Sequence, residues 1–238
     1  MATMIYPTQT IVEDYLRKIF PGLPKRNLNP SVSILGNISE HHTSPGIFGT
    51  LPVTVSSITG VDIPILVEDV VTTEGIVVII AQDPLRNVSD PMLQPFGPQF
   101  PNPIVGTPFA YHYHPSKAQQ TVVYRSVING LLKKGYRVYV TDVWKCWDQN
   151  KKTRMRRWSK NNPHYQCLLE ELNSVQPDRI LLMGNEAKNK FKSIEPELKK
   201  KINPDLVPHP SKANIQSWQE IGIGTDPNDR ADYILRLF

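Results

Sequence analysis

The sequence predicts an α/β fold of three layers, α/β/α, in which helices cover both faces of a central, mainly parallel sheet of four strands. Segments rich in β-branched and aliphatic residues alternate with segments whose apolar residues recur at helical spacing, and this alternation is typical of parallel sheets. Polar residues and prolines follow directly after two of the strand segments. In such folds, chemistry gathers at the carboxyl ends of the strands.

The strands are predicted from their aliphatic and β-branched residues. The run Ile-Val-Val-Ile-Ile-Ala within residues 75–81 is the most strand-like stretch of the chain, because continuous apolar runs are typical of strands buried on both faces. The three other predicted strands are residues 137–143, 179–183 and 205–207. A further strand, at residues 63–71, is interrupted by Pro64.

Apolar residues at helical spacing predict the helices. In the helix expected at residues 116–132, Ser116 is the N-cap and Gly135 follows as the stop signal. The other predicted helices are residues 10–20, 162–174, the Lys-rich stretch after Gly184, 212–220 and 230–238.

We expect one domain over residues 1–238, because this length suffices for a single substantial core. Residues 1–60 are rich in Pro, Asn, Ser, Gly and His, and we expect them to form an N-terminal extension that packs on the domain. Residues 83–108 contain too many prolines for regular structure. A loop of that length is usually functional.

Composition restricts the class of protein. No stretch is long and apolar enough to cross a bilayer, and residues 1–10 lack the basic and apolar regions of a secretory signal. The two cysteines, Cys146 and Cys167, neither suggest a disulfide scaffold nor supply a four-cysteine metal site. We therefore expect a cytoplasmic, intracellular protein.

Basic and aromatic residues gather at residues 144–160. Trp144, Trp147 and Trp158 lie among seven lysines and arginines and a single acid, Asp148. Cations beside flat rings suit phosphates and unstacked bases, and the net charge of +5 is compatible with a polyanionic partner. A solvated basic loop whose tryptophans belong to the core explains the same pattern. Both interpretations stay open at this point.

A carboxylate and an imidazole follow predicted strands that are far apart in the sequence. Asp83 comes after the strand 75–81, and His209 comes after the strand 205–207. Because the carboxyl ends of parallel strands meet at one edge, both side chains could face one cleft. His209 also begins the pentapeptide His-Pro-Ser-Lys-Ala, which occurs earlier at residues 114–118. In both copies Ser is placed to cap the following helix, where a phosphate can dock.

Short segments in this order and at these strand ends resemble the uracil-DNA glycosylase superfamily. Residues 79–84 resemble a strand that ends in the family's Gly-Gln-Asp-Pro motif, and residues 107–109 lie where the family keeps an aromatic ring that stacks on the extruded base. The remaining segments are residues 138–146, which resemble the strand with the base-reading residue, residues 180–187, a strand, glycine and helix, and residues 209–211, the final His-Pro-Ser motif.

The resemblance implies hydrolysis of the N-glycosidic bond of a base flipped out of DNA, with no metal and no organic cofactor. Asp83 would stabilise the oxocarbenium-like sugar and orient a water, and His209 would donate a hydrogen bond to the departing base. The residues implied to contact the base are Gln82, Leu85, Phe109 and Asp142, and those implied to contact flanking phosphates are Ser116, Ser211 and Lys212. The expected partner is DNA, bound by a monomer.

The sequence departs from the family's pattern at three of these positions. Ala81 replaces the glycine of the first motif, and Leu85 stands where the uracil-specific branch has a tyrosine that excludes bases methylated at the fifth ring carbon. Asp142 stands in place of the usual asparagine, and an ionised carboxylate only accepts hydrogen bonds. We therefore expect a base preference shifted away from uracil, unless Asp142 is buried and protonated. The N-terminal cysteine pair of the iron–sulfur branch is missing, so we expect no cluster.

Two alternative functions remain at this point. A glycosylase-like protein that binds DNA without cutting it would explain the departures from the motifs. A small-molecule α/β enzyme acting on a nucleotide or sugar phosphate would use the same strand-end loops. His112 and His114 are spaced to share a strand face, with His41 and His42 upstream. However, their spacing matches no zinc motif, so we expect no metal.

Overall fold

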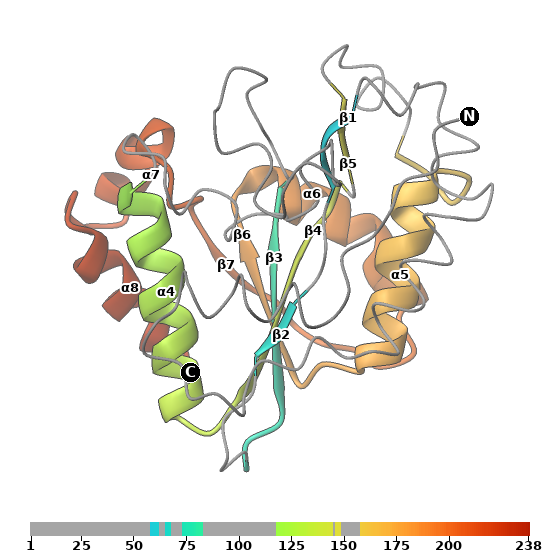
Figure 1. Ribbon diagram of the computed structural model, residues 1–238, viewed down its shortest axis with the longest axis horizontal. Coiled ribbons are helices and arrows are strands. Elements are labelled where there is room, and N and C mark those ends of the chain that lie inside the picture. Colours follow the sequence, from blue (N-terminus) through green and yellow to red (C-terminus); the bar gives the residue numbers. More distant parts are fainter. Residues whose placement is uncertain (1–57, 62–64, 68–72, 83–117, 145, 149–157) are drawn as a thin grey trace, which may run out of the picture.

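The computed structural model describes residues 58–61, 65–67, 73–82, 118–144, 146–148 and 158–238 (Figure 1). Its centre is a five-stranded sheet with the strand order β2-β4-β3-β6-β7. Four of these strands run parallel: β3 (Ile76–Ala81), β4 (Arg137–Asp142), β6 (Arg179–Met183) and β7 (Asp205–Val207). The predicted α/β class and the four parallel strands are confirmed, and β2 adds a fifth strand to the sheet.

Two further strand pairings lie outside the four parallel strands. β2 (Ile65–Val67) pairs antiparallel with β4 and lies inside the strand predicted at residues 63–71. A separate two-stranded sheet pairs β1 (Ile58–Val61) with β5 (Cys146–Asp148). The sequence analysis predicts no strand at residues 146–148, so β5 is an addition from the structure. Three residues are too few to show the alternation by which a strand is recognised in a sequence.

Helices cover both faces of the sheet, as Figure 1 shows. α4 (Ala118–Lys133) and α8 (Pro227–Leu235) pack together on one face. α5 (Pro163–Val175) and α6 (Asn185–Ile194) cover the other, where their apolar side chains share one core with the strands. The predicted three-layer α/β/α arrangement is confirmed.

The alternation of side chains along β3 explains its continuous apolar run. Val78 and Ile80 belong to the core cluster that includes Leu168 of α5 and Phe191 of α6. Val77, Ile79 and Ala81 point to the opposite face of the sheet, since successive side chains of a strand alternate, and all three are fully buried. Both faces of this strand are covered, so no position along it tolerates a polar residue cheaply.

Capping residues decide where the helices begin. The side chain of Asn162 accepts a hydrogen bond from the His164 backbone N–H at 2.9 Å, and Pro163 follows it as the first helical residue of α5, as the predicted start at residue 162 requires. Asp226 caps α8 in the same way. That helix therefore begins at Pro227 and ends at Leu235, so the predicted range 230–238 was wrong by three residues at each end.

The remaining sequence predictions have different outcomes. Gly135 adopts a φ of +87° and ends α4 as expected. The segment predicted as a helix at residues 212–220 divides into η5 (Lys212–Asn214) and α7 (Ile215–Glu220). The helix predicted at residues 10–20 and the cap Ser116 lie outside the described residues. No helix in the described part of the chain has the length and apolar character that a membrane crossing needs.

Tyr165 joins α5 to the turn that follows α6. Its hydroxyl hydrogen-bonds to the carboxylate of Glu197, in η4 (Glu195–Glu197), and lies 2.9 Å from the carbonyl oxygen of Ser193. Lys160 pairs with the same carboxylate at 3.1 Å. Burial, together with the neighbouring carboxylate, raises the pKa of Tyr165 to about 12.

We expect this tyrosine to make the fold sensitive to alkali. Its pKa is higher in the folded state than the ordinary 10.0, so its contribution to stability is fully present below about pH 10 and is lost as the pH rises toward 12. Tyr165→Phe should remove that part of the pH dependence. The measurement is the midpoint of urea unfolding between about pH 8 and 11.5. Tyr233→Phe serves as the control, and an equally steep decline in Tyr165→Phe would contradict the prediction.

Candidate functional site

The carboxyl ends of the four parallel strands form one edge of the sheet, in the order β4, β3, β6, β7. Asp142 is the last residue of β4 and lies opposite Ala81, the last residue of β3. The pairing continues one residue further, because the Trp144 backbone N–H donates to the Gln82 carbonyl at 3.1 Å. Gln82 and Asp142 are thus neighbours at this edge. Asp83, Leu85, Phe109 and Ser116 lie outside the described residues.

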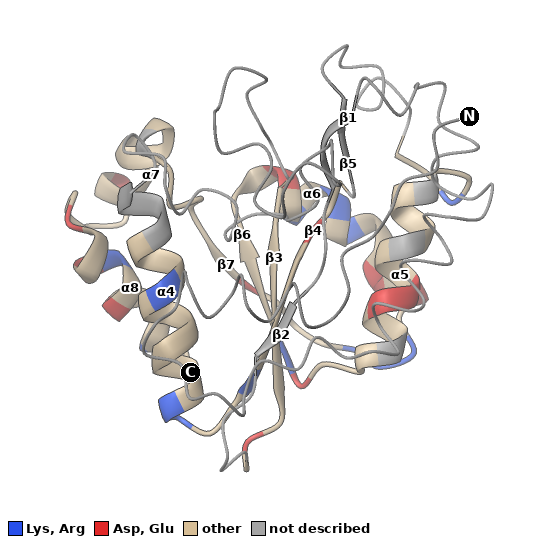
Figure 2. Cartoon of the chain, viewed as in Figure 1, with Lys and Arg blue, Asp and Glu red and all other residues tan. Residues whose placement is uncertain are grey.

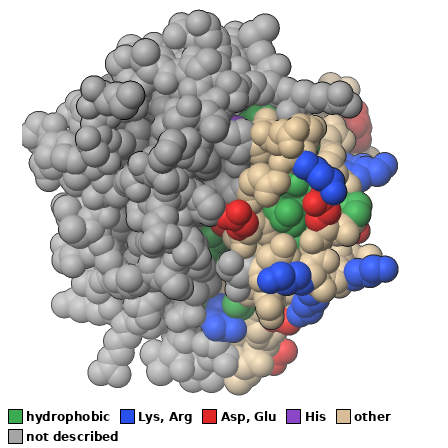
Figure 3. All heavy atoms as spheres, turned by 90° about the vertical axis from the view of Figure 1, so that its right-hand side faces the viewer, with side chains coloured by type: hydrophobic (Ala, Val, Ile, Leu, Met, Phe, Trp, Pro, Cys, Tyr) green, Lys and Arg blue, Asp and Glu red, His purple; other side chains and the backbone are tan. Residues whose placement is uncertain are grey.

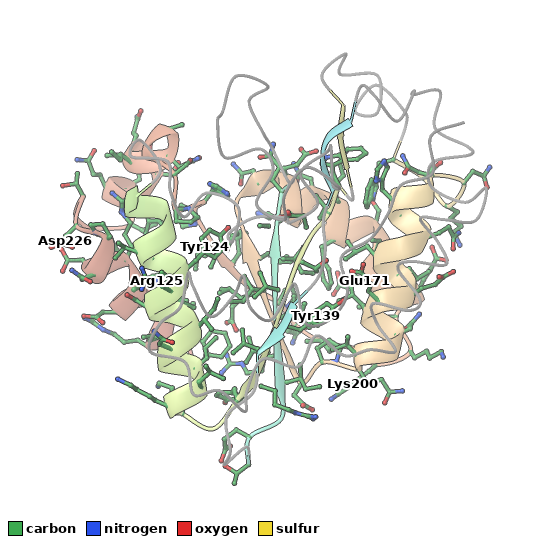
Figure 4. All side chains as sticks on the ribbon, in the orientation of Figure 1. Tyr124, Arg125, Tyr139, Glu171, Lys200 and Asp226 are labelled. Carbon is green, nitrogen blue, oxygen red and sulfur yellow. The ribbon has the colours of Figure 1, made fainter. Side chains whose placement is uncertain are left out.

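Asp142 is fully buried. Thr141, the residue before it, points to the α5 face, where its hydroxyl donates to the Glu171 carboxylate at 2.9 Å. Figure 4 shows Glu171 between α5 and the sheet. Because neighbouring residues of a strand point to opposite faces, Asp142 lies on the face covered by α4. A carboxylate therefore stands at the end of β4, within the protein, on one defined side of the sheet.

The turn after β6 brings the ends of β6 and β7 close together. Gly184 has a φ of +93°, and its backbone N–H donates to the Val207 carbonyl at 2.8 Å. A Cβ at this position would lie 3.0 Å from the Cβ of His209. Only glycine combines this backbone conformation with so close an approach. In the sequence this glycine marks the boundary between a strand and a helix, whereas its contact with His209 follows only from the three-dimensional structure.

His209 follows β7 and is partly exposed. Its Nδ1 accepts a hydrogen bond from the Ser211 backbone N–H at 3.3 Å. An acceptor at Nδ1 requires a lone pair there, so the neutral ring carries its proton on Nε2. The backbone carbonyl of His209 accepts a hydrogen bond from the indole of Trp218, a fully buried residue of α7, at 3.1 Å. Hydrogen bonds therefore fix both the imidazole ring and the backbone of His209.

The hydroxyl and the backbone N–H of Ser211 both make hydrogen bonds within residues 209–214. Its hydroxyl accepts a hydrogen bond from the Asn214 side-chain amide at 2.8 Å, and its backbone N–H is directed to His209. The Ser211 N–H is therefore engaged by His209. A contact between the Ser211 hydroxyl and a phosphate stays a prediction. Lys212 begins η5, and its side chain lies outside the described part of the structure.

Two of the three tryptophans near the basic segment belong to the core. The Trp144 indole is 2% exposed and donates to the Glu186 carboxylate at 3.0 Å. Trp158 packs against it with ring centres 5.1 Å apart and donates to the Lys190 carbonyl at 3.2 Å. For these two rings the structure favours the core interpretation over a stacking platform for bases. The side chain of Trp147 lies outside the described residues.

Charges on the described surface are mixed in sign (Figure 2). Lys190 lies 3.7 Å from Glu186, and Lys200 lies 2.7 Å from Asp178. The face turned to the viewer in Figure 3 likewise shows basic and acidic side chains next to one another. Among the described residues, no three His, Cys, Asp or Glu side chains come together as a metal site would require.

The family model of the uracil DNA glycosylase superfamily matches residues 69–232. This range contains all four parallel strands and the described residues of the sheet edge, from Gln82 to Ser211. No curated protein and no solved structure matches the chain. Since the family model covers more than half of the sequence, the chain belongs to the uracil DNA glycosylase superfamily.

Proposed function

We propose that this protein is a DNA glycosylase that hydrolyses the N-glycosidic bond of a flipped, damaged or non-standard base. The observation that carries the proposal is the hydrogen bond from the Ser211 backbone N–H to Nδ1 of His209 at 3.3 Å, because a neutral imidazole that accepts at Nδ1 has its proton on Nε2. Cleavage of this bond leaves a cationic sugar and an anionic base. A preorganised donor aimed at the departing base stabilises that developing negative charge.

The spacing of the strands supports a nucleotide-sized site. β6 separates β3 from β7, so the ends of β3 and β7 are two strand spacings, or about 10 Å, apart. Gly184, the residue after the intervening strand, has no side chain, and His209 packs closely against it at the border of this interval. We propose that the base lies here, with Asp83, the residue after Gln82, supplying the carboxylate that stabilises the sugar cation.

The substrate in this proposal is DNA rather than a free nucleotide, as family membership suggests. Enzymes that act on a base within DNA turn the nucleotide out of the stack, and contacts with the flanking backbone offset the cost. Ser116, Ser211 and Lys212 remain our proposed phosphate contacts, and we propose that a monomer suffices for binding.

Asp83→Asn and His209→Gln test the proposed chemistry. We expect each variant to lose roughly 100-fold or more in single-turnover rate, because each loses one stabilising group for the transition state. Both should still bind the oligonucleotide. The measurement uses single- and double-stranded oligonucleotides containing uracil, hypoxanthine, xanthine or an alkylated base. Asp232→Asn, an exposed carboxylate of α8, is the matched control.

Two outcomes would contradict the proposal. Wild-type protein that binds these oligonucleotides and cleaves none of them would be a glycosylase-fold DNA-binding protein. Wild-type protein that binds mononucleotides, and whose affinity for oligonucleotides does not fall with salt, would be a small-molecule enzyme, because binding to many phosphates depends steeply on salt.

Asp142 leads to a separate proposal about the target base. An ionised carboxylate accepts hydrogen bonds and suits two adjacent donors, such as those on the pairing edge of guanine or of protonated cytosine. It would repel the second carbonyl oxygen of uracil. Burial by itself favours a neutral carboxyl group, but two adjacent donors of a bound base would stabilise the carboxylate. We therefore propose that an alkylated guanine is a better substrate than uracil, with Asp142 ionised in the bound complex.

Asp142→Asn tests this preference. We expect the ratio of kcat/KM for uracil to that for alkylated guanine to rise by about 10-fold or more, since a bidentate base contact discriminates by roughly 1–3 kcal/mol. Competition between the two oligonucleotides measures the ratio, and Asp232→Asn again serves as the control. A wild-type protein that excises uracil alone would show that Asp142 does not exclude it.

A further inference from the structure

Buried side chains from the two C-terminal helices hold the segment that carries His209. Trp218 of α7 donates to the His209 carbonyl at 3.1 Å, and Arg230 of α8 donates through Nη1 to the Pro210 carbonyl at 3.4 Å. Both side chains are fully buried. Together with the hydrogen bond from Gly184 to Val207 at 2.8 Å, these contacts anchor the chain on both sides of the imidazole.

The guanidinium of Arg230 is directed to the backbone. Besides Pro210, it donates to the carbonyls of Gly224 at 3.3 Å and Thr225 at 2.8 Å. Its central carbon lies 5.9 Å from the centre of the Trp218 ring. Burial lowers the pKa of Arg230, and Asp226 opposes that shift. Burying a charge is costly, and an apolar side chain of similar volume would often fill such a site at lower cost. The arginine therefore calls for an explanation beyond packing.

One peptide group connects Arg230 to the imidazole of His209. The carbonyl of the Pro210–Ser211 peptide accepts from Arg230, and the N–H of the same peptide donates to Nδ1 of His209. The oxygen and hydrogen of a planar trans peptide point in opposite directions. Holding the oxygen therefore aims the N–H at the imidazole. A cationic donor on the carbonyl also polarises the peptide and strengthens its N–H as a donor.

Close packing of α8 against α4 fixes the helix that carries Arg230. At Gly130 of α4, a Cβ would lie 2.4 Å from Cδ1 of Leu235, the last residue of α8. The two helices are therefore in close contact, and α8 is fixed against the layer that covers the sheet. Arg230 projects from a helix that is itself anchored, rather than from a loose terminal segment.

We propose that Arg230 is a positioning residue. Through the Pro210–Ser211 peptide it holds His209 in the tautomer that carries the proton on Nε2. The consequence for catalysis rests on the proposed glycosylase function, whereas the tautomer is a property of the protein without substrate. Arg230 itself contacts no reacting atom in this proposal.

The test combines ¹⁵N NMR of the imidazoles with kinetics. The chain contains six histidines, and the His209 signals are assigned by their loss in His209→Gln. At about pH 8, where an ordinary imidazole is neutral, wild-type protein should show an unprotonated Nδ1 and a protonated Nε2. In Arg230→Met the two nitrogens should shift toward averaged values, as in a mixture of tautomers. The single-turnover rate should fall roughly 10- to 100-fold with little change in substrate affinity.

Arg230→Lys keeps the charge but loses the fork of donors, so we expect a smaller tautomer shift and partial recovery of the rate. If Arg230→Met does not fold, Arg230→Lys alone tests the proposal. Arg236→Met, at an exposed arginine just after α8, is the matched control and should resemble wild type. Wild-type imidazole signals in a folded Arg230→Met, or in Arg230→Lys when the first variant is unfolded, would overturn the proposal.

The readouts separate this proposal from the glycosylase proposal. A tautomer shift in a protein that cleaves no base would support the role of Arg230 and refute the chemistry. Cleavage by wild type, with unchanged His209 signals in the folded variants, would refute only the role of Arg230.

Discussion

Parallel pairing in register is the constraint on which the candidate site depends. β4, β3, β6 and β7 all end at the same edge of the sheet, so residues separated by more than a hundred positions in the sequence lie next to one another. This pairing places Gln82 beside the end of β4 and Gly184 beside the segment of His209. Because both faces of the sheet are packed with helices, this edge is where polar groups can meet a ligand without disturbing the core.

The segment after β7 is fixed by hydrogen bonds to its backbone and to the ring of His209. The Ser211 N–H donates a hydrogen bond to the imidazole of His209, and Arg230 donates to the carbonyl of the Pro210–Ser211 peptide. Trp218 donates to the carbonyl of His209 itself. Each of these polar groups would be costly to leave unpaired within the protein. The network therefore restricts the segment to few conformations, which a hydrogen-bond donor needs if it is to be in place before the reaction begins.

Much of the fold could be predicted from the sequence, because continuous apolar runs and helical spacing report burial directly. The strands at residues 179–183 and 205–207 have the bounds expected of them. β5 was missed because three residues carry no period, and the start of α8 was missed although Asp226 and Pro227 form a capping signal. The sequence pointed to His209 through its place after a predicted strand, and to Asp142 through a family resemblance. It contained no signal for Arg230, since an arginine in a helix is ordinarily exposed and only the structure shows it buried.

We propose that Nε2 of His209 faces the leaving base, in the interval between the ends of β3 and β7. A crystal structure with an oligonucleotide whose modified sugar resists hydrolysis tests this claim most directly. We expect a flipped base in that interval, with one of its acceptor atoms about 2.7–3.2 Å from Nε2 and the Ser211 N–H still donating to Nδ1. A base bound elsewhere on the protein, or one that faces Nδ1, would contradict it.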